Sequence, residues 1–199
     1  MKIAMLLEKQ PLFYVGIGAS AGGLNALTEF FTHLPANTPA AYFVITHLGR
    51  YHKSELSQII GRHTEMPVIP VDRAMPVEAG NIYFLVENTE MVFDKAGIIP
   101  HARPEGETNR AVDTFFISLA KYHGRQSVGI ILSGGGQDGL AGALAIDKKG
   151  GTVLVQDPGS SAYSGMPNAI ITNDHPAAIL PPAALAEQVM RLVNLVDTK

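Results

Sequence analysis

Short apolar runs rich in β-branched residues alternate along this chain with segments whose apolar residues recur at helical spacing. A strand that is apolar along its whole length is buried on both faces, as in a parallel sheet covered by helices. Strands that alternate with helices form right-handed βαβ units. The alternation therefore predicts an α/β fold, a doubly wound and mostly parallel sheet with helices on both faces, in three α/β/α layers.

The predicted elements follow these two periodicities. The strands are the apolar runs 12–17, 41–46, 67–71, 81–86, 127–132 and 152–156. The helices are the segments 24–34, 54–62, 110–122, 140–149, 167–172 and 182–196. A hairpin is predicted over 90–99 with its turn near Lys95-Ala96-Gly97. Ser54 is a candidate N-cap for the second helix.

One segment is a candidate linker. Residues 100–109 are rich in charge and proline and separate two halves of the chain. We expect the two halves to share one sheet. Residues 1–199 are therefore expected to form a single domain, a size for which one well-packed core is ordinary.

Composition excludes several classes of function. The net charge is −3 with no basic block, which argues against a nucleic-acid partner held through its phosphates. The absence of cysteine removes disulfides, thiolate metal sites and cysteine nucleophiles. No run approaches the roughly 20 apolar residues that span a bilayer, and the apolar stretch 3–7 is too short for a signal-peptide core. We therefore expect a cytoplasmic protein without membrane insertion.

Residues 16–23 form a glycine-rich turn between the first strand and the first helix, and three interpretations compete for it. Gly16, Gly18 and Ala21 satisfy the loose dinucleotide pattern G-x-G-x-x-G/A. That pattern also needs an acidic residue at the end of the second strand, and this strand ends at His47 without one. The nucleotide interpretation is therefore the weakest of the three.

The other two interpretations concern Ser20. The stretch 18–22 fits G-x-S-x-G, which places a serine nucleophile on a tight strand-to-helix turn. The helix N-terminus would then present free N–H groups that can stabilise an oxyanion. Alternatively, Ser20 is only the N-cap of the helix that follows.

A serine nucleophile needs a base, and the base needs an orienting acid. Functional residues of a parallel sheet gather at the carboxyl ends of its strands. His47 follows the second predicted strand and Asp138 follows the strand 127–132, so both would lie at the same edge as Ser20. The rival bases are His52 and His101.

The acid has a rival and an alternative role. Asp157 follows the strand 152–156, but it precedes Pro158 and is equally well explained as a turn residue. Asp138 is equally well explained as the cap of the helix 140–149. The run 134–136, three glycines after a buried strand, favours a site at Asp138 because glycine lets backbone N–H groups approach a ligand closely.

No cofactor or metal is expected. The P-loop pattern and H-E-x-x-H are absent, and no histidines and carboxylates stand at ligand spacing. The order Ser, His, Asp also differs from the Ser, Asp/Glu, His order of α/β-hydrolases. The chemistry of that fold is therefore expected without its topology.

Several motifs, in their order along the chain, resemble the CheB-type protein-glutamate methylesterases. The similarity extends over about residues 13–182. The motifs that carry it are Gly18-Ala-Ser-Ala-Gly-Gly23, Thr46-His-Leu48, Asn109-Arg-Ala-Val-Asp-Thr-Phe-Phe116, Gly129-Ile-Ile-Leu-Ser-Gly-Gly-Gly-Gln-Asp-Gly139, Val155-Gln-Asp-Pro158 and Gly165-Met-Pro167.

The resemblance implies a role for each site residue. It makes Ser20 the nucleophile, His47 the base and Asp138 the orienting acid, with the backbone N–H groups of Ala21 and Gly135 as candidates for the oxyanion hole. Arg103, Asn109 and Met166 fall in motifs expected at the substrate cleft.

The resemblance also implies a reaction and its partners. The reaction is hydrolysis of glutamate methyl esters on chemoreceptor helices, with release of methanol and, in some members, deamidation of receptor glutamines. The implied partners are methylated cytoplasmic receptor helices, and a methyltransferase or receiver domain as a further one.

Two departures from the family pattern favour an alternative. The two-domain members carry an N-terminal receiver domain, for which this chain has no room. The motifs of this chain are closer in sequence to the esterase segment of esterase–methyltransferase fusions. Gly135 stands where the family often has methionine, which predicts a more flexible loop at this position. The alternative is a catalytically weak or inactive esterase-like docking module in chemosensory signalling.

Overall fold

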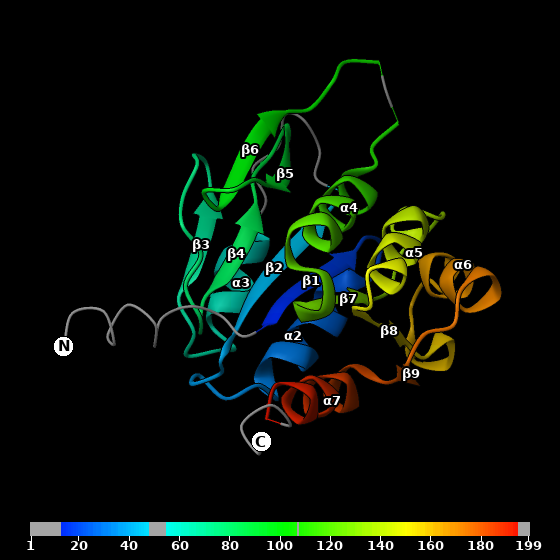
Figure 1. Ribbon diagram of the computed structural model, residues 1–199. Helices are drawn as coiled ribbons and strands as arrows, with labels where there is room; N and C mark the ends of the chain where they lie inside the picture. The colour runs from blue at the N-terminus through cyan, green and yellow to red at the C-terminus, as the bar shows by residue number, and fades with distance from the viewer. Residues whose placement is uncertain (1–12, 48–54, 107, 195–199) are drawn as a thin grey trace.

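The computed structural model describes residues 13–47, 55–106 and 108–194. Seven strands form one sheet in the order β3-β4-β2-β1-β7-β8-β9, and every neighbouring pair is parallel. Figure 1 shows this twisted sheet between two layers of helices. The strands are β1 Phe13–Ala19, β2 Ala40–Thr46, β3 Val68–Val71, β4 Ile82–Leu85, β7 Ser127–Ile131, β8 Thr152–Gln156 and β9 Ala178–Leu180.

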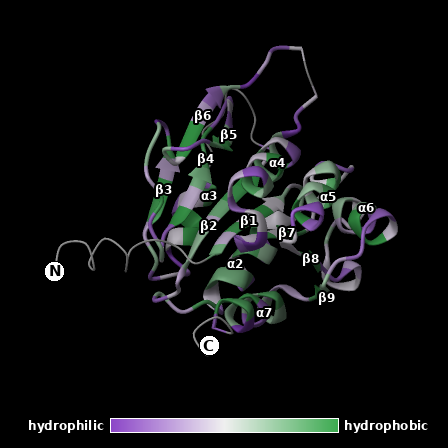
Figure 2. Ribbon diagram, in the orientation of Figure 1, coloured by the Kyte–Doolittle hydropathy of each residue, from purple (hydrophilic) through white to green (hydrophobic). Residues whose placement is uncertain are grey.

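Each face of the sheet is covered by its own apolar cluster. One cluster holds α2 (Gly23–Thr32), α3 (Leu56–Gly61) and α7 (Pro182–Asn194) against the sheet. The other holds the hairpin and three helices: β5 Thr89–Phe93, β6 Ile98–Ala102, α4 Ala111–His123, α5 Leu140–Lys148 and α6 Gly165–Asn173. Figure 2 shows hydrophobic residues concentrated on the central strands and the helix faces that meet them.

The predicted fold class is confirmed, and the two halves of the chain do share one sheet. The antiparallel hairpin is also present, although Pro100, predicted to begin a loop, pairs with Met91 inside β6. The short edge strand β9 was not predicted, because only three residues between prolines form it. Leu12, Ser54 and Val196, three of the predicted element residues, lie outside the described residues.

Glycines on the central strands let α4 approach the sheet closely. Side chains alternate along β1, so that Val15 and Ile17 face one helix layer while Gly16 and Gly18 face α4. A Cβ at Gly16 would lie 2.8 Å from the Phe116 ring, and one at Gly18 would lie 2.5 Å from Val112. The first turn of α4 therefore lies directly on the end of β1, where the chain continues to Ser20.

Truncation of Phe116 tests this packing. Phe116→Ala should lower the free energy of unfolding by about 3–5 kcal/mol, because the ring is fully buried against Gly16, Gly129 and Gly142 and would leave a cavity. The adjacent Ile117 is 47% exposed, so Ile117→Ala should change the free energy of unfolding by less than about 1 kcal/mol. Urea denaturation measures both, and equal losses would contradict this packing.

The far end of α4 carries a histidine that the fold keeps neutral. The His123 ring stacks on Tyr14 with centroids 3.5 Å apart and meets Phe93 edge-on. Burial lowers the pKa of His123 from 6.5 to about 4. The neutral ring is therefore part of the apolar packing between α4, β1 and β5.

A pH dependence of stability follows. Between pH 6.5 and about 4 the unfolded chain binds a proton at His123 that the folded chain does not, so this residue lowers stability as pH falls through that window. His123→Phe should retain the ring stacking and reduce the loss of stability on acidification. His33→Gln, at an exposed position, should leave that loss as it is in the wild type. Urea midpoints between pH 7 and pH 4 measure the slopes, and a wild-type slope in His123→Phe would refute the prediction.

Candidate active site

Three strand ends bring the candidate site together. Ser20 follows β1 directly, His47 follows β2, and Asp138 lies in the turn after β7. β1 lies between β2 and β7, and the register pairs Ala19 with Thr46. From β1 the chain continues to β2, which pairs on one side of β1, and β7 later pairs on the other side. The site therefore lies where the strand order reverses, the usual place for a ligand site in an open parallel sheet.

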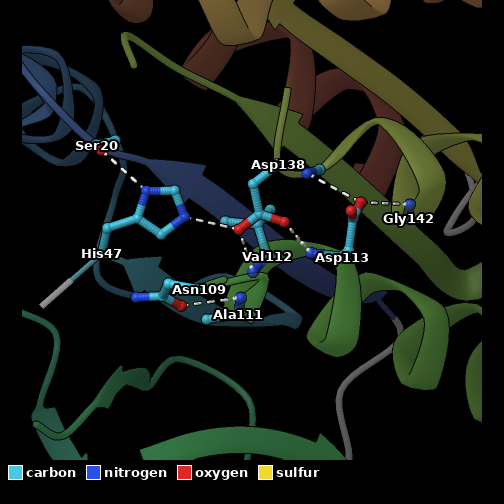
Figure 3. Close-up of polar contacts among 9 residues, drawn as sticks. Ser20, His47, Asn109, Ala111, Val112, Asp113, Asp138 and Gly142 are labelled. Carbon is cyan, nitrogen blue, oxygen red and sulfur yellow. Dashed lines mark hydrogen bonds and ion pairs between the residues drawn. The ribbon is translucent and has the colours of Figure 1, made fainter. Parts of the chain in front are cut away.

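The three side chains form one hydrogen-bonded chain (Figure 3). The His47 Nδ1 lies 3.0 Å from the Ser20 Oγ, and the His47 Nε2 lies 2.7 Å from the Asp138 Oδ2. A carboxylate can only accept, so Nε2 carries the proton and the bare Nδ1 accepts a hydrogen bond from the serine hydroxyl. Chymotrypsin-type triads use the two ring nitrogens the other way round. The hydroxyl of Ser20 thus faces a nitrogen that can take its proton.

Two rival residues have no such arrangement. His101 is exposed on β6, and the Asp157 side chain accepts a hydrogen bond from the Gly159 N–H, so Asp157 caps the short turn η2 (Pro158–Ser160). The interpretation of Asp157 as a turn residue is therefore confirmed. His52, the other rival base, lies outside the described residues.

The turn at Ser20 is shaped by the residues after it, not by serine capping. Gly22 is the N-cap of α2 with φ 74°, and α2 has no side-chain cap. The interpretation of Ser20 as the cap is therefore wrong. A Cβ at Gly22 would lie 2.6 Å from the Ala162 Cβ and 2.8 Å from the Ser133 Oγ, so both the backbone angle and the space require glycine. The Ser20 hydroxyl is thereby left to His47.

Asp138 caps a helix, but not the one that follows it. The N-cap of α5 is Gly139, without a side-chain cap bond. The Asp138 carboxylate instead accepts from the N–H of Val112 at 3.0 Å and of Asp113 at 2.9 Å, in the first turn of α4. Charge-assisted bonds to a helix N-terminus stabilise a carboxylate. Asp138 is therefore held in place by α4 while its Oδ2 also meets His47.

Two buried polar residues, Ser133 and Gln156, tie the Ser20 turn to the glycine loop, residues 134–136. The Ser133 carbonyl accepts from the Ser20 N–H at 2.9 Å, and the Ser133 Oγ donates to the Ala21 carbonyl at 2.8 Å. The buried Gln156 in turn accepts from the Ser133 N–H at 2.8 Å. Both residues stand within the family motifs, but a single polar residue at the end of an apolar strand does not by itself indicate this role.

The backbone N–H groups of Ala21 and Gly135 are available to a ligand. Both residues are exposed, and neither N–H has an acceptor among the residues that the structure describes. A Cβ at Gly134 would lie 3.1 Å from the Ser20 Cβ, so the glycine loop adjoins the nucleophile turn. The two free donors therefore lie on the two segments that border the Ser20 side chain.

The three expected cleft residues are placed differently. The Asn109 Oδ1 accepts from the Ala111 N–H at 3.2 Å and lines a groove of about 510 Å³ together with Asp138. Arg103 follows β6, where its N–H donates to the Asn88 carbonyl. Met166 is fully buried beneath Gly134, so the expectation that it lines the cleft is wrong. Its side chain fills the space under the glycine loop instead.

A second groove borders the nucleophile itself. It has a volume of about 460 Å³ and contains Ser20 and His47 at one side. Its walls come from α2 and α3 and are largely apolar: Leu24, Leu27, Leu56 and Ile59. A substrate at Ser20 would therefore meet both apolar walls and exposed backbone donors.

Within 13–47, 55–106 and 108–194, no group of three or more His, Cys, Asp or Glu side chains is arranged to hold a metal ion. None of the helices in these ranges is long and apolar enough to cross a membrane.

Comparison with known proteins decides the family. The CheB methylesterase family model matches residues 15–189, which is most of the chain. The chain belongs to the CheB methylesterase family. A solved relative, the CheB methylesterase catalytic domain of Thermotoga maritima, superimposes with a TM-score of 0.84 at 25% identity and covers 91% of this chain and 98% of its own.

Curated relatives of the family are longer than this chain. Protein-glutamate methylesterase/protein-glutamine glutaminase 2 of Burkholderia pseudomallei is 32% identical over 182 residues, which are 90% of this chain and 53% of the relative. The protein-glutamate methylesterase/protein-glutamine glutaminase of Trichodesmium erythraeum is 30% identical over 90% of this chain and 53% of its own. The chain thus spans about half the length of these relatives.

The role of Ser133 as a fastener predicts a joint loss of stability and activity. Ser133→Ala removes the donor to Ala21 and the acceptor for the Tyr163 N–H, which should cost about 1–3 kcal/mol of unfolding free energy. For the ester hydrolysis proposed below, it should also lower kcat/KM, because the turn that carries Ser20 loses a tether.

A matched control separates the two effects. Ser118 also makes two hydrogen bonds: its Oγ accepts from the Phe93 N–H and donates to the Phe115 carbonyl. Ser118 lies in the middle of α4, beyond the first turn that contacts Asp138. Ser118→Ala should lower the urea midpoint similarly and leave kcat/KM unchanged. Normal kcat/KM in Ser133→Ala would refute the tethering role.

Proposed function

We propose that this chain hydrolyses methyl esters of glutamate side chains on chemoreceptor helices. The observation that carries the proposal is the hydrogen-bonded chain Ser20–His47–Asp138 at the strand-order reversal of a CheB-family fold. The free N–H groups beside Ser20 and the names of the curated relatives also support it.

The first half of the reaction forms a glutamyl-enzyme. The His47 Nδ1 takes the proton of Ser20 as the Oγ attacks the ester carbonyl carbon. The Asp138 carboxylate, bound to Nε2–H, stabilises the imidazolium that results. The N–H groups of Ala21 and Gly135 donate to the oxyanion. The C–O bond to methanol then breaks, and His47 returns the proton to the leaving oxygen.

The second half releases the product. Water attacks the acyl carbon, His47 takes its proton, and the Ser20 oxygen leaves with that proton. Glutamate and the free enzyme result. A glutamine side chain enters the same cycle with ammonia as the leaving group, so the proposal includes deamidation. Each step uses groups of the chain, and the proposal assigns no cofactor or metal to it.

The substrate of this proposal is a side chain on the surface of a helix. Ser20 is partly exposed and Ala21 and Gly22 are exposed, so a glutamyl side chain can reach the nucleophile from outside. The helices of receptors that carry such esters are cytoplasmic, and the proposal places the reaction there. A methyltransferase or a receiver domain is proposed as a further partner.

The rival proposal is a docking module without useful activity, and Gly135 is its main support. A Cβ at Gly135 meets no atom within 4 Å, so the space around the Cβ position does not require glycine there. The complete hydrogen-bonded chain at Ser20 favours the enzyme, because a docking module has no need of it.

Covalent labelling tests the proposal. A fluorophosphonate probe should label the chain at Ser20, because only a serine activated by a base attacks such a probe readily. Ser20→Ala should abolish labelling, and His47→Gln should slow ester hydrolysis, with losses on the order of 10⁶-fold typical for nucleophile or base. Mass spectrometry locates the label.

The control is a serine outside the hydrogen-bonded chain. Ser57 lines a neighbouring groove, and Ser57→Ala should label as the wild type does. Hydrolysis of a methylated receptor peptide, followed as methanol release, completes the test. Absent labelling together with absent methanol release would favour the docking module over the enzyme.

A further inference from the structure

Helices α4 and α5 cap each other through exchanged aspartates. Their own N-cap residues, Arg110 and Gly139, make no side-chain cap bond. Asp138, which precedes α5, caps α4 as described above. Asp113, in the first turn of α4, accepts from the N–H of Gly139 and of Gly142, both at 2.9 Å. Each helix therefore receives a capping carboxylate from the other, while Asn109 accepts from the Ala111 N–H at the start of α4 (Figure 3).

This exchange closes a ring of bonds around Asp138. The Asp113 carboxylate holds the N–H of Gly139, the peptide group attached directly to Asp138. The Asp113 N–H in turn donates to the Asp138 Oδ1 at 2.9 Å. Asp113 therefore fixes both the backbone and the carboxylate of Asp138, and through it the His47 Nε2.

The ionised form of Asp113 has an electrostatic cost that a neutral cap would avoid. Asp113 is 8% exposed. Burial, and to a lesser degree the neighbouring Asp138 charge, raise its pKa, while the N–H groups of Gly142 and Gly139 and the Arg110 charge oppose the rise. An asparagine oxygen would accept the same two N–H groups without this repulsion. Asp113 keeps a carboxylate despite this repulsion, and a carboxylate holds N–H groups more strongly than a neutral oxygen does.

We propose that Asp113 is a positioning residue for this site: it holds the backbone and the carboxylate of Asp138 where the Asp138 Oδ2 meets the His47 Nε2. The inference rests on the proposed function, in which Asp138 orients His47 as the base. Asp113 itself touches neither Ser20 nor the substrate.

Three variants test the inference. Asp113→Asn keeps an acceptor for the Gly139 and Gly142 N–H groups and removes the charge. It should lower kcat several-fold with little change in KM, because a neutral amide oxygen holds the Gly139 and Gly142 N–H groups less strongly than a carboxylate does. Asp113→Ala should lose more kcat and also unfold at lower urea. Asp147→Asn, at an exposed position on α5, should match the wild type in all these readouts.

The split between kcat and stability separates positioning from simple capping. If Asp113→Asn keeps the wild-type kcat, while Asp113→Ala loses only stability, Asp113 is a helix cap alone and the inference is overturned. If Asp113→Asn does not fold, Asp113→Glu replaces it. That variant keeps the charge but displaces it by one methylene, so kcat should fall, and an unchanged kcat would overturn the inference.

The proposed function is checked separately in the same assay. Ser20→Ala must abolish hydrolysis if the proposed nucleophile is correct. Active Ser20→Ala would sink the proposed function itself. A normal Asp113→Asn beside an inactive Ser20→Ala would leave that function standing and reject only the role of Asp113.

Discussion

The carboxylate of Asp138 is the point at which the fold and the candidate site meet. It accepts hydrogen bonds from His47, 91 residues away in the sequence, and from two N–H groups in the first turn of α4. One carboxylate thus satisfies part of a helix N-terminus and fixes the tautomer of an imidazole. A buried charge is tolerated only with such partners, so the packing of α4 against the sheet is a condition for the site.

That packing depends in turn on the absence of side chains. Gly16 and Gly18 on β1 leave the space that Phe116 and Val112 occupy, and the first turn of α4 can then lie above the end of the central strand. Met166 of α6, in the same apolar cluster as Val112 and Phe116, fills the space beneath Gly134. Small residues at the strand ends and large ones around them therefore set how closely Ser20, His47 and Asp138 approach one another.

The sequence was sufficient to predict features with a local or topological signature. Hydrophobic periodicity located most strands and helices, and the rule that parallel strands end at one edge selected His47 and Asp138 as partners for Ser20. It was insufficient for capping and burial between distant segments. Ser20 and Asp138 both resembled caps of the helices that follow them, but Gly22 takes the first place and Asp138 caps α4. Asp113, Ser133 and Gln156 act through segments more than 20 residues away, so no local pattern distinguishes them.

The central claim is that Asp138 holds the His47 ring with its proton on Nε2, so that a bare Nδ1 faces the Ser20 hydroxyl. Nitrogen-15 NMR of histidine-labelled protein at a pH where His47 is neutral measures this directly. The account predicts a protonated, pyrrole-like Nε2 and an unprotonated, pyridine-like Nδ1 for His47, and loss of this preference in Asp138→Ala. A proton on Nδ1 in the wild type would contradict the account.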